Sequence, residues 1–150
     1  MWKNGGMDLQ TEGVFTIVVN KKQEVLLVKR KDLPIWDLPG GRVDERELLE
    51  EAAKREVREE TGYEVEIVDK VGVYVRPSFH DVQHIYTGIV TGGWGIENGP
   101  ETAKLKFFNP KCLPLLMVPH RKKQIRDYQK NKRHLKEILE DSWLFLKLFH

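Results

Sequence analysis

The feature that most constrains the fold is a segment, residues 44–61, that contains neither glycine nor proline and is built mainly from Glu, Arg, Ala and Leu. Its length and composition predict an α-helix. Asp44 is the expected N-cap, with Glu47 three residues later completing a capping-box pair, and Gly62 is the expected C-terminal stop. Segments typical of β-strands lie on both sides, so the sequence predicts a mixed α/β fold.

Carboxylates occupy an unusual place on this helix. On a helical wheel, four apolar side chains form one broad face: Leu49, Ala52, Ala53 and Val57. Glu56 and Glu60 fall in the middle of that face and Glu59 flanks it, whereas an amphipathic helix would place its acids on the opposite side. Unpaired charges directed toward the body of a protein are costly. The pattern therefore indicates carboxylates that face a cavity.

Acidic oxygens that converge in this way suit a hard divalent cation, Mg²⁺ or Mn²⁺, which also binds phosphates. Arg55 is adjacent and can brace a carboxylate, and the turn at Gly40 and Gly41 can bring bare backbone to the same place. The alternative is a surface helix stabilised by ion pairs between neighbouring turns. It explains Glu56 and Glu60 poorly, but it explains the outer charges well: Glu50, Glu51, Lys54 and Arg58.

These residues belong to a longer pattern. Eight positions match the Nudix box, G-x5-E-x7-R-E-U-x-E-E-x-G-U, in register: Gly41, Glu47, Arg55, Glu56, Val57, Glu59, Glu60 and Gly62. The final position is usually a bulky aliphatic residue and is Tyr63 here. Residues 25–30, 36–41, 105–108 and 113–114 also resemble family segments. The chain thus resembles the Nudix hydrolases over about residues 12–130.

The resemblance implies a Nudix-type α/β/α sandwich with a mixed β-sheet, in which the box forms a loop-helix-loop. It also implies hydrolysis of a nucleoside diphosphate linked to another group. Four groups match the family's ligands of Mg²⁺ or Mn²⁺: the carboxylates of Glu56, Glu59 and Glu60 and the carbonyl of Gly41. Arg55 would orient a box glutamate. Glu47 would support the loop through a cap or an ion pair.

The general base is open at this stage. Glu60 is one candidate, and other family members use a glutamate from a later loop, where Glu97 and Glu101 both qualify. The alternative for each loop acid is a solvated surface group.

Three residues are candidates for substrate contact. Arg30 closes a strand, where it would meet phosphate or, alternatively, discourage edge pairing. Arg76 precedes Pro77 at another strand end, and Trp94 could stack a base from a Gly-rich loop.

The organisation of the chain follows from the remaining pattern. Residues 1–150 are expected to form a single domain, with a core of about 12–130 and a C-terminal helical extension of about 131–150. Strands are expected at 11–20, 24–30, 65–68, 71–75, 83–91 and 105–108. A helical pattern is expected from His120 onward.

Composition limits the class of protein. The 25 basic and 23 acidic residues give a net charge of +2, which argues against a dedicated nucleic-acid coat. Cys112 is the single cysteine, so an internal disulfide is excluded and a reducing compartment is the default. No apolar run reaches the ~20 residues needed to cross a bilayer. We therefore expect a cytoplasmic protein with no membrane partner.

Three functions remain open from the sequence. The first is a pyrophosphohydrolase acting on a nucleotide, with nucleoside triphosphates as the default. The second is a catalytically silent nucleotide-binding or regulatory module, which would usually lack box glutamates that this chain retains. The third is an RNA 5′-end pyrophosphohydrolase that uses the basic segment 120–136, although a solvated helix face explains that charge better. The apolar tail, residues 135–149, would pack on the domain or in a homodimer.

Overall fold

The computed structural model describes residues 10–96 and 99–141. One eight-stranded sheet, in the order β3-β2-β1-β6-β5-β8 with β4 paired to β1 and β7 to β2, forms the centre of the molecule. Its strands are β1 (Thr11–Val19), β2 (Val25–Arg30), β3 (Trp36–Asp37), β4 (Gly40–Arg42), β5 (Tyr63–Arg76), β6 (Asp81–Gly93), β7 (Thr102–Phe108) and β8 (Leu135–Ile138). The helices are α1 (Leu49–Thr61) and α2 (Arg121–Gln129), and a short 3₁₀ turn spans Pro77–Phe79.

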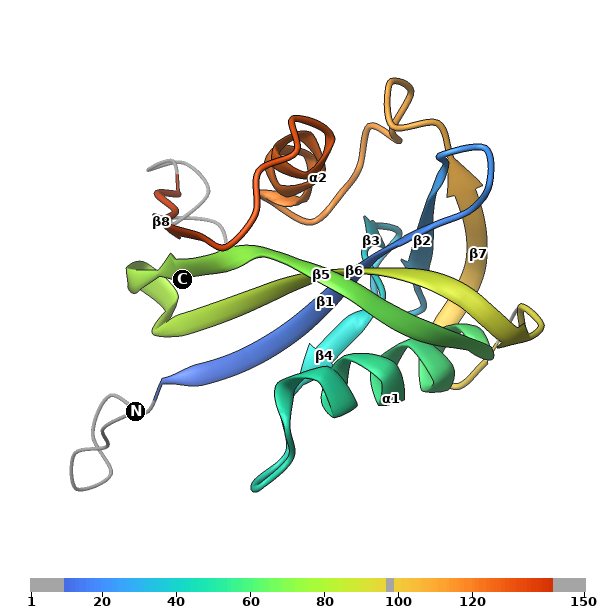
Figure 1. The fold of residues 1–150 in the computed structure, drawn as a ribbon, viewed down its shortest axis with the longest axis horizontal. Coiled ribbons are helices and arrows are strands. Elements are labelled where there is room, and N and C mark those ends of the chain that lie inside the picture. Colours follow the sequence, from blue (N-terminus) through green and yellow to red (C-terminus); the bar gives the residue numbers. More distant parts are fainter. Residues whose placement is uncertain (1–9, 97–98, 142–150) are drawn as a thin grey trace.

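The sheet is mixed and lies between the two helices. β1 runs parallel to β6 and β5 runs parallel to β8, whereas the other pairs are antiparallel. Figure 1 shows α1 on one face of the sheet and α2 on the other. This arrangement confirms the expected α/β/α sandwich and places the Nudix box residues, on β4 and α1, over the middle of the sheet.

The core has a layer on each side of the sheet. On the α1 side, Val14 and Tyr86 pack with Ala52 and Ala53. On the α2 side, a larger cluster joins the sheet to α2 and to the segment after β8: Ile17, Leu27, Tyr74, Ile125 and Leu139 among others. Removal of this apolar surface from water holds both helices on the sheet.

The ends of α1 differ in how well the sequence predicts them. The helix stops at Gly62, whose φ of 81° is left-handed and whose N–H donates to the Arg58 carbonyl, as expected. The expected N-cap at Asp44 is wrong, because α1 begins at Leu49 with Leu48 as its N-cap. Arg46 has a φ of 65°, which interrupts the helical backbone before that point. Asp44 and Glu47 instead close a turn through two 3.0 Å hydrogen bonds.

Two further expectations need correction. Residues 65–68 and 71–75 lie in one long strand, β5, which has register shifts rather than a break. The helical extension predicted for residues 131–150 is wrong at Leu135–Ile138, which form strand β8, while residues 142–150 lie outside the described part. α2 ends at Gln129, and left-handed backbone at Asn131 and His134 turns the chain back toward the sheet. No helix within the described ranges is long and apolar enough to cross a membrane.

Candidate active site

Two glycines bring the β4 backbone against its neighbours. Gly40 and Gly41 pair with Phe15 and Val14 of β1. A Cβ on Gly40 would lie 2.2 Å from the Val14 carbonyl oxygen, and a Cβ on Gly41 would lie 2.7 Å from the carboxyl group of Glu56. Only glycine fits at position 40, because the β1 backbone cannot yield, whereas a side chain at position 41 would displace the Glu56 carboxyl group. The approach brings backbone groups next to the box carboxylates.

Glu60 is anchored where α1 meets this turn. Its Oε1 accepts a 2.8 Å hydrogen bond from the Gly40 N–H. Burial raises the pKa of the Glu60 carboxyl to about 8, and the carboxylates of Glu56 and Asp37 act in the same direction, while the Gly40 hydrogen bond opposes them. A bound cation would stabilise the ionised form of this buried carboxyl group and so lower its pKa again.

Arg55 ties the other box carboxylates together. Its Nε donates to Glu47 at 2.7 Å, and its Nη1 donates to Glu59 at 2.8 Å and to Glu56 at 3.0 Å. Nη2 reaches the carbonyl of Arg42 at 3.0 Å, which fixes the loop before α1. These carboxylates, Glu47 first, raise the pKa of Arg55 above its ordinary value. The fork of a single guanidinium therefore sets the positions of three acids.

The residues present fit a hard divalent cation. Glu56, Glu59 and Glu60 lie on one face of α1 beside the Gly41 turn, and they supply only oxygen donors, which Mg²⁺ and Mn²⁺ prefer. Burial also raises the pKa of Glu56. A cation bound here would therefore stabilise the ionised carboxylates of both Glu56 and Glu60. In the parts of the chain that the structure describes, no three acidic, His or Cys side chains already form a metal cluster. Arg55 instead pairs with Glu56 and Glu59.

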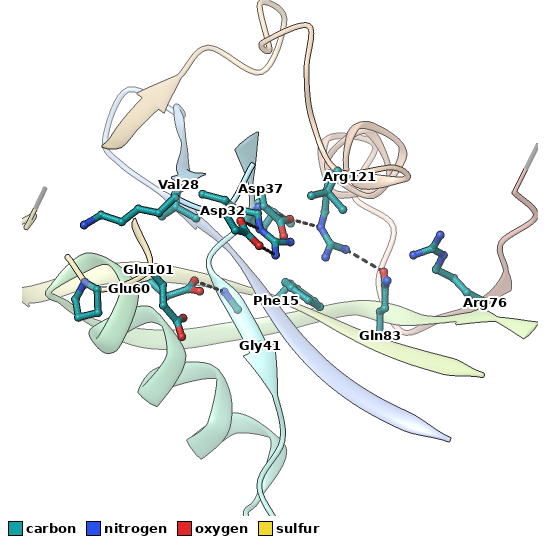
Figure 2. A pocket seen from close by; sticks show the side chains of 16 residues that line it. Phe15, Val28, Asp32, Asp37, Gly41, Glu60, Arg76, Gln83, Glu101 and Arg121 are labelled. Atoms are coloured by element: carbon teal, nitrogen blue, oxygen red, sulfur yellow. Dashed lines mark hydrogen bonds and ion pairs between the residues drawn. The ribbon is translucent and has the colours of Figure 1, made fainter. Parts of the chain in front are cut away.

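A cleft of about 500 Å³ extends from this acidic corner across the sheet. That volume falls within the range of nucleotide-sized ligand sites, ~300–1,000 Å³. Glu60, Gly41 and Glu101 lie toward one end of it, and Arg121, Gln83 and Arg76 lie toward the other, as Figure 2 shows. Two acids, Glu60 and Glu101, therefore lie at one end of the cleft and two guanidinium groups, of Arg121 and Arg76, lie at the other.

The cationic end is built around a buried arginine. Arg121 is 2% exposed and donates from Nε to Asp37 at 2.5 Å and from Nη1 to Gln83 at 2.9 Å. Its guanidinium lies 3.8 Å from the centre of the Phe15 ring, a cation–π contact. Gln124 accepts a further bond from Nη1 at 3.0 Å. These contacts fix Arg121 as part of the cleft floor.

The structure brings some predicted residues to the cleft and leaves others away from it. Arg30 and Arg76 line it, and Arg30 pairs with Asp32 through two hydrogen bonds. Glu101 lines the cleft and also a second hollow beside Glu56 and Glu59. The Glu101 carbonyl accepts from Lys31 N–H at 3.1 Å, which holds this acid at the end of β2.

One predicted loop residue does not line the cleft, and another lies outside the described residues. Trp94 is 78% exposed and is not among the residues that line it, so its stacking role stays a prediction without geometric support. Glu97 lies outside the described residues, and Glu101 is thus the loop acid with a defined place near the box.

Sequence reasoning missed much of the cleft wall. Phe15, Asp37, Gln83 and Arg121 all line it, and none was a candidate. The signal for Asp37 was its place within the residues 36–41 that lead into the box. Arg121 was hidden in the basic segment 120–136, where most charges resembled a solvated helix face. The partners that bury Arg121, Asp37 and Gln83, lie far from it in sequence.

The site and the sheet define a class of protein: the chain belongs to the Nudix family of hydrolases. The NUDIX domain family model matches residues 9–128, which include the whole box and the cleft residues up to Arg121. A fold match agrees, since a Nudix hydrolase from Nitrosomonas europaea superimposes with a TM-score of 0.78 at 21% identity, over 94% of this chain and 82% of that one.

Curated relatives are named as pyrophosphate-cleaving enzymes. A putative 8-oxo-dGTP diphosphatase from Bacillus subtilis (strain 168) is 52% identical over 136 residues, which cover 91% of both chains. An ADP-ribose pyrophosphatase from Methanocaldococcus jannaschii is 34% identical over 75% of this chain and 70% of its own. An RNA pyrophosphohydrolase from Erythrobacter litoralis is 28% identical over 79% of this chain and 88% of its own. The chain is thus similar to diphosphate hydrolases that differ in their substrates.

Proposed function

We propose that this Nudix hydrolase cleaves a diphosphate bond of a nucleoside triphosphate in a reaction that depends on Mg²⁺ or Mn²⁺. The observation that carries the proposal is a cleft of nucleotide size that has the box carboxylate Glu60 at one end and Arg121 and Arg76 at the other. A triphosphate chain would lie at the acidic end, together with its cation, and the nucleoside would extend toward Arg121 and Arg76. The name of the Bacillus subtilis relative favours a purine nucleotide, oxidised or not.

The chain's own groups divide the work. Glu56, Glu59, Glu60 and the Gly41 carbonyl would hold the divalent cation. When bound, that cation neutralises phosphate charge and lowers the pKa of a coordinated water. A water oxygen would form a bond to phosphorus, the bridging P–O bond would break with its electron pair leaving on the oxygen of the departing pyrophosphate, and the water proton would pass to a carboxylate.

Arg30 would contact the phosphates, in keeping with its place at the cleft wall. Glu60 and Glu101 are the candidates for the proton acceptor, since both line the cleft. Glu97 stays a third candidate that lies outside the described residues. Arg55 would keep Glu56 and Glu59 in place through its hydrogen bonds.

The test is a substrate screen with Mg²⁺ or Mn²⁺, covering nucleoside triphosphates, 8-oxo-dGTP and ADP-ribose. ³¹P NMR of the products distinguishes release of pyrophosphate from release of phosphate. We expect a nucleoside monophosphate and pyrophosphate from a triphosphate, and no turnover with a chelator present. Absence of turnover on every compound, with tight nucleotide binding, would instead support the silent nucleotide-binding module.

A second candidate is hydrolysis at the 5′ end of RNA, for which the name of the Erythrobacter litoralis relative provides the support. Fewer basic side chains of segment 120–136 are available to contact RNA than its composition suggests. Arg121, Lys123 and Arg133 pair with acids of the same chain, at Asp37, Glu137 and Asp69. Turnover of 5′-triphosphorylated RNA that exceeds turnover of GTP and falls steeply with salt would favour this candidate.

The cytoplasmic location and the possible homodimer remain proposals. The first rests on the single cysteine, Cys112. The second rests on the apolar tail, whose residues 142–150 lie outside the described part. Sedimentation that finds only monomer would rule out the homodimer.

A further inference from the structure

The segment that follows α2 adds a strand to the sheet beyond residue 128, where the family match ends. β8 runs parallel to β5, with Gly72 opposite Leu135 and Val75 opposite Ile138. A Cβ on Gly72 would lie 2.7 Å from the Cβ of Leu135, so glycine is needed for this close approach. The Leu139 N–H then donates to the Val75 carbonyl at 2.7 Å, which extends the pairing toward Arg76.

The pairing of β8 with β5 places Asp141 next to Arg76, a residue that lines the cleft. The Asp141 side chain is 2% exposed, and its Oδ1 accepts from Arg76 Nη2 and from His120 Nε2, both at 2.8 Å. Burial alone would raise the pKa of Asp141, but the hydrogen bonds from Arg76 and His120 outweigh it and lower the pKa. Asp141 is therefore a buried anion that Arg76 and His120, from two other segments, share.

Arg76 lies between this anion and the cleft. Its guanidinium is 4.3 Å from the centre of the Phe79 ring, and the residue lines the cleft at the end away from Glu60 (Figure 2). His120, the second partner of Asp141, directly precedes Arg121. One carboxylate thus contacts Arg76 directly and also contacts the residue that precedes Arg121.

We propose that Asp141 is a positioning residue: it holds the guanidinium of Arg76 at the cleft wall, where that group contacts the nucleoside side of the substrate. The inference rests on the proposed function, since the contact requires a nucleotide in the cleft. It assigns to the C-terminal segment a part in substrate binding that the box residues do not supply. Without the anion, the Arg76 guanidinium loses a charge-assisted hydrogen bond that helps to fix its orientation.

The test compares Asp141→Asn with wild type in steady-state kinetics on the best nucleotide of the screen. Asn keeps the volume and one acceptor oxygen but removes the charge. We expect KM to rise about tenfold while kcat changes less than twofold, because the change affects binding and not the bond cleavage. In an Arg76→Gln background, the same substitution should raise KM by less than twofold, since the two residues act as one unit.

The matched control is Asp127→Asn. Asp127 is a similarly buried carboxylate that accepts from Tyr74 at 2.8 Å and from Lys123 at 3.0 Å, but it does not line the cleft. We expect it to lower the melting temperature like Asp141→Asn and to leave KM unchanged. Equal KM effects in the two variants, or an unchanged KM in folded Asp141→Asn, would overturn the positioning role.

A second readout does not depend on turnover. In ¹⁵N-edited NMR spectra, the side-chain Nε–Hε signal of Arg76 should shift and exchange faster with solvent in Asp141→Asn than in wild type. An unchanged Arg76 signal would refute the inference even for an inactive protein. Failure of wild type to hydrolyse any nucleotide would count against the proposed function, and the NMR comparison would still decide whether Asp141 holds Arg76.

Discussion

The Glu60 carboxylate and the Gly40 backbone N–H are joined by a 2.8 Å hydrogen bond that links α1 to β4 at the acidic end of the cleft. This bond fixes one oxygen of Glu60 against the turn. The pKa of the carboxyl is raised to about 8 by burial, so its environment favours the protonated form unless a cation is near. The backbone thus holds Glu60 in position, and burial raises the pKa of its carboxyl group.

Glu60→Gln should lower kcat by at least ~100-fold, the scale on which loss of a proton acceptor or a cation ligand acts. The fold should persist, because the Gln oxygen can still accept the Gly40 hydrogen bond. Steady-state kinetics and a thermal melt measure the two effects. Glu51→Gln, on the exposed side of α1 beside Lys54, is the control and should behave like wild type. Near-normal turnover in Glu60→Gln would remove Glu60 from the chemistry.

Gly41→Ala should reduce turnover strongly, because its Cβ would lie 2.7 Å from the Glu56 carboxyl group and displace it. The matched control is Gly92→Ala, where the new Cβ would meet Glu64 at an ordinary 3.7 Å. We expect loss of activity and weaker Mg²⁺ or Mn²⁺ binding in the first variant only, measured by kinetics and metal titration. Wild-type turnover and metal binding in both variants would show that the close approach of Gly41 has no functional role.

The sequence predicts the local parts of this site and not the non-local ones. The face of α1 that carries Glu56 and Glu60 is set by helical periodicity, and the stop at Gly62 is set by its backbone freedom, so both could be predicted. Arg121 could not, because its burial depends on Asp37, 84 residues earlier in the chain. β8 was equally hidden, since its pairing relies on the space that Gly72 leaves. Long-range contacts of this kind leave no periodic trace in the sequence.

Glu101→Gln should lower kcat by ~100-fold or more if this acid takes the proton from the attacking water. Its place supports the prediction, because it lines both the cleft and the hollow beside Glu56 and Glu59. Glu97→Gln serves as the comparison from the same loop and is expected to retain turnover. Steady-state kinetics on the best nucleotide of the screen measures kcat for each variant. The reverse ranking of the two variants would assign the role to Glu97.

His84, which does not line the cleft, should make the free energy of unfolding depend on pH. Its neutral ring can accept from Lys70 at Nδ1, 3.0 Å away, and donate from Nε2 to Glu12 at 2.9 Å. Burial lowers the pKa of His84 below its ordinary 6.5, and Lys70 adds to this, while Glu12 opposes it. The folded protein therefore binds this proton less tightly than the unfolded chain does.

The contribution of neutral His84 is thus complete above pH 6.5 and declines as the pH falls toward the lower folded-state pKa. Relative to His84→Gln, wild type should lose up to ~1.4 kcal/mol per pH unit in that window. Urea unfolding of both proteins at pH 7.5 and pH 5.5 measures the difference, with the ordinary pKa lying between the two conditions. A stability gap between the proteins that is the same at both pH values would mean that His84 does not change its proton affinity on folding.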